Sequence, residues 1–118
     1  TCPYVFDAEQ SAAMAEAGAD IIVAHMGLTS KGTIGAKTVL SLDDCIPRIK
    51  DIIKAARDVN PDVMVICHGG PIAEPKDAQY IISNIPELDG FFGASSIERF
   101  AAERGIKAQT EDFKAIQK

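Results

Sequence analysis

The sequence predicts an α/β chain of four consecutive βα units with parallel strands. Short apolar runs alternate with longer segments in which apolar residues recur at helical spacing. The runs at 20–24 and 63–67 are apolar on both faces, which is typical of parallel strands buried between layers. Such alternation requires crossover connections, which are right-handed. The composition agrees, since 118 residues with 47% apolar and 25% charged side chains fit one ordinary globular domain at most.

The first strand and helix are expected within residues 3–18. Residues 3–6 form a short apolar run that predicts a strand. Residues 7–18 are alanine-rich and favour a helix, and Asp7 and Gln10 stand at the spacing of a capping box. The second strand follows at 20–24.

The second helix is predicted to begin near Asp43 and Asp44 and to end at Asn60, which precedes a proline. Pro47 is expected in its first turn, where a missing N–H is tolerated. The apolar residues of this segment fall at helical spacing: Ile46, Ile49, Ile52, Ile53 and Ala56.

The last two units follow the same pattern. A strand at 63–67 precedes a helix that opens at Glu74 and Pro75 and carries three isoleucines at 81, 82 and 85. A fourth strand is predicted at 88–92. Residues 95–104 and 109–117 are then expected to form two separate helices.

Two architectures are compatible with this order: an open doubly wound sheet, or half of a (β/α)8 barrel of about 250 residues. No G-x-G-x-x-G motif follows the first strand, so a dinucleotide-binding sheet has no support. We interpret residues 1–118 as a partial domain that starts in a strand, without Met, and belongs to a longer chain. A half-barrel leaves edge strands and an inner face uncovered. We therefore expect a homo-oligomer, or docking onto a missing N-terminal half.

Charge and cysteine content exclude several classes of function. The formal net charge of −5 argues against binding to nucleic acid, whose partners concentrate Lys and Arg. No apolar run approaches the roughly 20 residues of a membrane span, and no signal peptide is visible. Three widely spaced cysteines suggest neither a disulfide framework nor a zinc site. The sequence thus predicts a cytoplasmic protein without a metal site of its own.

Both histidines stand directly after a buried strand and before a glycine, at His25-Met26-Gly27 and His68-Gly69. Barrel chemistry takes place at such carboxyl ends of strands. On neighbouring strands the two ends lie ~5 Å apart, so the imidazoles could act together as general acid and base, hydrogen-bond donors or metal ligands. The alternative is that each is a structural histidine. Asp7 is a further catalytic candidate on this rim, or the cap of its own helix.

Small residues that could hold an anionic ligand surround the predicted rim: Gly27, Gly69, Gly70, Gly93, Ser95 and Ser96. Against this role, Ser95 and Glu98 have the spacing of a capping box, which would occupy the Ser95 hydroxyl. Cys67 is expected to face the helices as a core residue, because neighbours along a strand point to opposite faces. The long loop of residues 27–42 is a lid candidate whose Lys31 and Lys37 could meet an acidic substrate.

Three strings carry a resemblance to a known family: His25-Met26-Gly27-Leu28-Thr29, Cys67-His68-Gly69-Gly70-Pro71-Ile72-Ala73-Glu74-Pro75 and Gly90-Phe91-Phe92-Gly93-Ala94-Ser95-Ser96-Ile97-Glu98-Arg99. The chain resembles the phosphoenolpyruvate hydrolase-like TIM-barrel family, also described as TIM-barrel signal-transduction proteins. The resemblance covers essentially the whole chain, and it implies the C-terminal half of the domain, with strands five to eight of the barrel.

The resemblance also implies a function. Similar enzymes act on small 2-oxo acids or enol phosphates with Mg²⁺, by C–P, P–O or C–C bond chemistry, and their metal-binding carboxylates come chiefly from earlier strands. The matched rim positions are then His25 and His68 as polar contacts, the two glycine turns as ligand-binding turns, and Glu74 as a weaker candidate. The alternative is a non-catalytic metabolite-sensing domain of a sigma-54-type transcriptional regulator. In both, the expected partner is a small anionic metabolite.

Overall fold

The structure is a computed structural model of the chain, and it describes residues 1–28 and 40–117. Four strands and four helices alternate among them: β1 (Tyr4–Val5), α1 (Ala8–Glu16), β2 (Ile21–His25), α2 (Leu42–Val59), β3 (Met64–His68), α3 (Pro75–Asn84), β4 (Gly90–Phe91) and α4 (Arg99–Lys114). Most of the predicted lid, including Lys31 and Lys37, lies outside the described residues.

The strands form one parallel sheet in the order β1-β2-β3-β4. Strands β2 and β3 pair over five residues each, whereas β1 and β4 are only two residues long and shorter than predicted. Both short strands lie at an edge of this sheet, where a strand has a hydrogen-bonded neighbour on one side only. The predicted βα alternation is confirmed.

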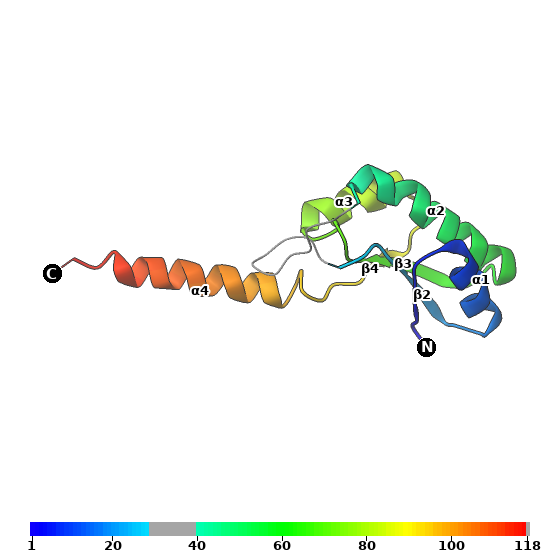
Figure 1. Cartoon of the computed structure of the whole chain (residues 1–118), viewed down its shortest axis with the longest axis horizontal. Coiled ribbons are helices and arrows are strands. Elements are labelled where there is room, and N and C mark those ends of the chain that lie inside the picture. The colour runs from blue at the N-terminus through cyan, green and yellow to red at the C-terminus, as the bar shows by residue number, and fades with distance from the viewer. Residues whose placement is uncertain (29–39, 118) are drawn as a thin grey trace.

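Helices α1, α2 and α3 cover one face of the sheet, and no helix of the described residues lies on the opposite face (Figure 1). Right-handed crossovers between strands in sequential order place every helix on the same side. A doubly wound sheet would reverse its strand order and carry helices on both faces. The arrangement is therefore that of four consecutive units of a (β/α)8 barrel, half of its eight strands.

The core fills the space between the helices and the covered face of the sheet. Its members from the strands are Val5, Ile22, Ala24, Val65 and Cys67, and those from the helices include Ala15, Cys45, Ile49, Ile52, Ala56 and Ile81. Ser11 of α1 is fully buried and donates a hydrogen bond of 2.8 Å to the Ile52 carbonyl of α2. The covered face of every strand is thus apolar, as the predicted alternation of side chains requires.

Helix α2 begins one residue earlier than predicted. Ser41 is its N-cap, and Ser41 and Asp44 form a reciprocal capping box. Pro47 therefore lies in the second turn, so the prediction of a first-turn proline was wrong. The helix continues because its buried isoleucines pack on the sheet and outweigh the one backbone hydrogen bond that Pro47 lacks.

Helix α4 is one continuous helix of 16 residues, and the prediction of two helices was wrong. Gly105 interrupts the helical pattern, but one glycine costs only about 1 kcal/mol in a helix. The Lys107–Glu111 ion pair and the hydrogen bond from the Thr110 hydroxyl to the Ile106 carbonyl span the following turns. The helix projects from the body (Figure 1), and the whole chain extends 67 × 27 × 24 Å.

The face of the sheet opposite the helices is apolar and exposed. Alternation along the strands places Tyr4, Phe6, Met64 and Phe92 on this side, and each side chain is 40–47% exposed. Large hydrophobic side chains gathered on one exposed face are typical of protein or membrane interaction sites and of ligand-binding grooves. In a closed barrel this face would line the interior.

We predict that residues 1–118 produced alone self-associate, because the uncovered face buries its apolar side chains only against another chain. Sedimentation velocity at micromolar concentration should show dimers or larger species. Met64→Lys, which places a charge on that face, should shift the distribution towards monomer, whereas Lys76→Ala on the helical side should not. A folded monomer of the unmodified chain would contradict the half-barrel interpretation.

Candidate functional site at the carboxyl ends of the strands

A row of four ring side chains crosses the carboxyl ends of the strands. His25 and His68 are register partners in β2 and β3, and their ring centroids lie 4.9 Å apart in an edge-to-face arrangement. Phe6 continues the row beyond His25, with centroids 5.0 Å apart, and Phe92 continues it beyond His68 at 5.3 Å. We call these four residues the aromatic row. The predicted proximity of the two histidines is confirmed.

Tyr4 lies against the row from the next level of the sheet, two residues before Phe6. Its ring centroid is 4.8 Å from that of His25 and 5.3 Å from that of His68, on which it stacks at an interplanar angle of 23°. Rings in contact exclude water from the inner side of both imidazoles. His68 is consequently 9% exposed, whereas His25 is partly exposed.

Each histidine is oriented by a backbone group. Nδ1 of His68 lies 2.7 Å from the carbonyl oxygen of Phe92, just beyond β4. The backbone N–H of Gly27 donates to Nδ1 of His25 at 3.0 Å. Burial, and to a smaller extent the neighbouring His68, lower the pKa of His25 from its ordinary value of 6.5. Both effects favour the neutral form of His25.

The glycines after β2 and β3 join the two rim loops. Gly70 donates from its backbone N–H to the carbonyl of Gly27 at 2.7 Å, and its φ of +61° is in the left-handed region. A Cβ on Gly70 would lie 2.3 Å from the Met26 carbonyl oxygen. These glycines thus have a structural reason to be glycine, and the Gly70 amide is directed at the neighbouring loop.

Gly93, Ser95 and Ser96 form a turn between β4 and α4. The capping box predicted for Ser95 and Glu98 is wrong, because α4 begins at Arg99, with Glu98 at its N-cap and no side-chain cap. The backbone N–H groups of residues 97 and 98 instead bond the carbonyl of Ala94 within the turn. Ser95 is therefore not engaged as the helix cap.

Asp7 and Glu74 are placed at helix starts, apart from the aromatic row. The Asp7 carboxylate caps α1 by accepting from the Gln10 N–H at 2.8 Å. Glu74 precedes α3 and forms an ion pair with Arg104 of α4. For both carboxylates the contacts described are structural. Their catalytic and ligand-binding roles stay predictions.

Cys67 is fully buried on the helical side of β3, as predicted. Burial raises the pKa of its thiol to about 12, and burial likewise raises the pKa of Cys45 to about 11. Neither thiol is a nucleophile at neutral pH. Of the candidate groups at this rim, the two imidazoles therefore stay the predicted proton-transfer groups.

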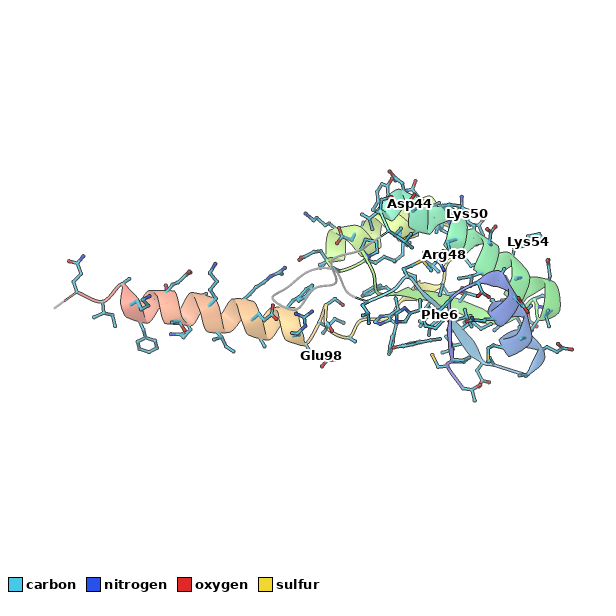
Figure 2. All side chains as sticks on the ribbon, viewed as in Figure 1. Phe6, Asp44, Arg48, Lys50, Lys54 and Glu98 are labelled. Carbon is cyan, nitrogen blue, oxygen red and sulfur yellow. The ribbon has the colours of Figure 1, made fainter. Side chains whose placement is uncertain are left out.

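A pocket of about 300 Å³ opens beside His25, at the ends of β1 and β2. Its described lining residues are Phe6, His25, Met26, Gly27, Leu28, Leu40 and Arg48. Arg48 reaches from α2 towards the end of β1 (Figure 2), and its Nε donates to the Phe6 carbonyl at 3.1 Å. It brings a positive charge to an otherwise apolar pocket next to a histidine.

Sequence reasoning missed Arg48, Tyr4 and the two phenylalanines of the aromatic row. The phenylalanines could have been found by register, because they follow β1 and β4 at the level at which the histidines end β2 and β3. Tyr4 stands two residues before Phe6, so the alternation of side chains places it on the same face. Arg48 had no such signal, because its position depends on how α2 packs over the strand ends.

The described residues do not fit a Mg²⁺ site. They contain no group of three or more His, Cys, Asp or Glu side chains placed to hold a metal ion. Mg²⁺ prefers oxygen ligands, and the polar side chains of the aromatic row are imidazoles. The expectation of Mg²⁺ in the full-length protein stays a prediction. Among the described helices, none is both long enough and apolar enough to cross a membrane.

Sequential parallel strands, helices on one face and polar side chains at the strand ends define a TIM-barrel type of domain. The chain belongs to the phosphoenolpyruvate hydrolase-like family, whose sequence model matches residues 1–116. The family resemblance noted in the sequence is thereby confirmed.

Three relatives align over 116 residues, 98% of this chain. Two are tomato (Solanum lycopersicum) proteins, "ToMV susceptible protein tm-1(GCR26)" at 49% identity and "ToMV resistance protein Tm-1(GCR237)" at 48%. The third is "Putative transcriptional regulatory protein y4pA" of Sinorhizobium fredii, at 34%. The chain spans 15% of the length of each tomato protein and 19% of the bacterial one.

We predict that Gly70→Ala destabilises the fold more than Gly18→Ala. Both glycines have positive φ, so alanine at either position costs about 1–2 kcal/mol of backbone energy. Only at Gly70 does the added Cβ also meet a backbone carbonyl, because nothing lies within 4 Å at Gly18. Urea unfolding of both variants measures the difference. Equal losses would show that the contact between the rim loops is not tight.

We predict that His25 titrates below pH 6.5, because burial disfavours its charged form. Between the lowered pKa and 6.5 the unfolded chain binds more protons than the folded one, so stability falls as pH drops below about 6.5. NMR titration of the ring Cε1–H signals, assigned with His25→Gln, gives the midpoint. A midpoint at or above 6.5 would contradict the described burial.

Proposed function

We propose that this chain supplies part of a barrel rim that binds a small anionic 2-oxo acid or enol phosphate. The observation that carries the proposal is the aromatic row, in which two imidazoles stand side by side at the ends of neighbouring strands. Strand ends of this kind are where TIM-barrel proteins bind their substrates. The imidazoles would polarise the substrate or exchange protons with it.

The anionic character of the ligand is supported by Arg48. The chain as a whole has a formal net charge of −5, so its overall field does not attract anions. Arg48 places a guanidinium in the pocket beside His25, and Lys50, two residues further along α2, lines a different pocket. A guanidinium held at its Nε can still present its terminal N–H groups to a carboxylate or phosphate.

A second candidate function is metabolite sensing. The relative from Sinorhizobium fredii carries a regulatory name, and sensing uses the same bound ligand without conversion. The two functions differ only in whether the bound ligand is converted. Both therefore require the pocket and Arg48, and only the enzyme requires a proton transfer at His68.

The test uses the protein in its full natural length, with phosphoenolpyruvate and phosphonopyruvate as ligands. Isothermal titration calorimetry measures binding, and release of phosphate and pyruvate measures turnover. Arg48→Ala should weaken binding at least about tenfold, because a hydrogen bond to a charged group contributes about 1.5–3 kcal/mol. Lys50→Ala is the matched control on the same helix and should bind normally.

The outcomes separate the candidates. Turnover that His68→Ala abolishes supports an enzyme, and binding without turnover supports a sensor. If neither ligand binds, or if Arg48→Ala and Lys50→Ala bind equally well, the proposed anion site is wrong.

A further inference from the structure

The two histidines of the aromatic row are held by opposite kinds of backbone group. A carbonyl oxygen only accepts hydrogen bonds, so Nδ1 of His68, at 2.7 Å from the Phe92 oxygen, carries a proton. A neutral imidazole has one N–H, and Nε2 of His68 is then left with a lone pair. Neutral His68 is therefore a hydrogen-bond acceptor and a base at Nε2.

His25 has the reverse arrangement. A backbone N–H only donates, so Nδ1 of His25 accepts from Gly27 at 3.0 Å and is not protonated. The single proton of the neutral ring is therefore on Nε2. Protonation of Nδ1 would break this bond. Neutral His25 is thus a hydrogen-bond donor at Nε2.

Opposite tautomers give neighbouring rings opposite roles. The ring centroids are 4.9 Å apart, a distance that a small ligand can span. His25 lines the pocket that also contains Arg48, and His68 is the next ring of the row and is 9% exposed. To remove a proton from the carbon next to a carbonyl, a site needs a base at the C–H bond and a hydrogen-bond donor at the carbonyl oxygen. In a 2-oxo acid those two groups are on adjacent carbon atoms.

We propose that the aromatic row catalyses keto–enol proton transfer on a 2-oxo carboxylate, with His68 as the base, His25 as the neutral donor to the carbonyl oxygen and Arg48 as the carboxylate anchor. This inference rests on the proposed function, since it names the reaction at the same site.

The step balances without a further reactant. Nε2 of His68 takes a proton from C3, and the C–H electron pair becomes the C2=C3 bond. The carbonyl π pair moves to oxygen, where the Nε2–H of His25 stabilises the enolate by a hydrogen bond. Return of the proton from His68 to C3 restores the ketone. In D₂O the proton on Nε2 of His68 exchanges with solvent while the enolate is bound, and return of a deuteron to C3 then replaces hydrogen by deuterium there.

The surroundings favour this step. Tyr4 stacks on His68 and packs against His25, and Phe6 and Phe92 flank the pair. Behind these rings His68 is only 9% exposed, and a hydrogen bond to developing negative charge is stronger where water is excluded. Cys67, the nearest thiol in sequence, points to the other face and is fully buried, which leaves the imidazoles to act.

The decisive experiment measures deuterium exchange into pyruvate by the full-length protein in D₂O. Loss of the methyl proton signal is followed by NMR, with buffer alone as the background, and pyruvate binding is measured separately by calorimetry. His68→Gln should lower the exchange rate by about 10²–10⁴-fold, the usual contribution of a general base, while it retains most of the binding. His25→Gln keeps an N–H donor and should retain more exchange than His25→Phe.

The possible results separate a failure of this inference from a failure of the proposed function. Absence of pyruvate binding overturns the proposed 2-oxo acid site. If pyruvate binds but its methyl protons do not exchange, the 2-oxo acid site is retained and the proposed proton transfer is overturned. Exchange that His68→Gln leaves unchanged overturns the role of His68, and Lys50→Ala should exchange like the unmodified protein.

A second measurement needs no variant at the site. Long-range ¹H–¹⁵N correlation spectra of the labelled protein report which ring nitrogen carries the proton. We expect Nδ1–H with a bare Nε2 for one histidine and the reverse for the other. Two rings with the same tautomer at neutral pH would overturn the inference even if the variants failed to fold.

Discussion

The order of the four parallel strands is the constraint on which the rest of the structure depends. Right-handed crossovers between sequential strands put α1, α2 and α3 on one face of the sheet, so the apolar residues of that face alone build the core. The other face carries exposed Met64, Tyr4 and the aromatic row. The same topology that stabilises one side therefore leaves the side with the candidate chemistry open. The candidate site and the uncovered apolar face therefore lie on the same side of the sheet.

The fold was predictable from sequence wherever the signal was local and strong. The buried runs of β2 and β3 identify the central strands, and alternation correctly places Cys67 with the helices and His68 opposite. Helix boundaries were predicted less well: the segment around Gly105 suggested a break, yet i to i+4 contacts carry α4 through it. The wrong capping box at Ser95 has a similar origin, since its spacing alone does not show where a helix starts.

The site was predictable only in part, because it depends on contacts between distant segments. Strand periodicity brings the histidines together, but their orientation comes from a carbonyl 24 residues after His68 and from an amide two residues after His25. The glycines were expected to hold an anion, whereas in the structure Gly70 bonds the loop that carries Gly27. That hydrogen bond is accepted by the carbonyl of Gly27, the residue whose N–H orients His25, and it comes from the loop that follows His68. The glycine turns thus hold together the two loops that follow the histidines.

The lone pair on Nε2 of His68 bears on the choice between enzyme and sensor. A site that only binds an anion gains from donors, and a lone pair directed at a carboxylate or an enolate oxygen repels it. Two imidazoles that both donated from Nε2 would serve a sensor better. The Phe92 carbonyl instead fixes the proton of His68 on Nδ1 and keeps Nε2 as a base. An acceptor at Nε2 is what the proposed proton transfer requires of His68, whereas a sensor would use the same lone pair only to accept a hydrogen bond from its ligand.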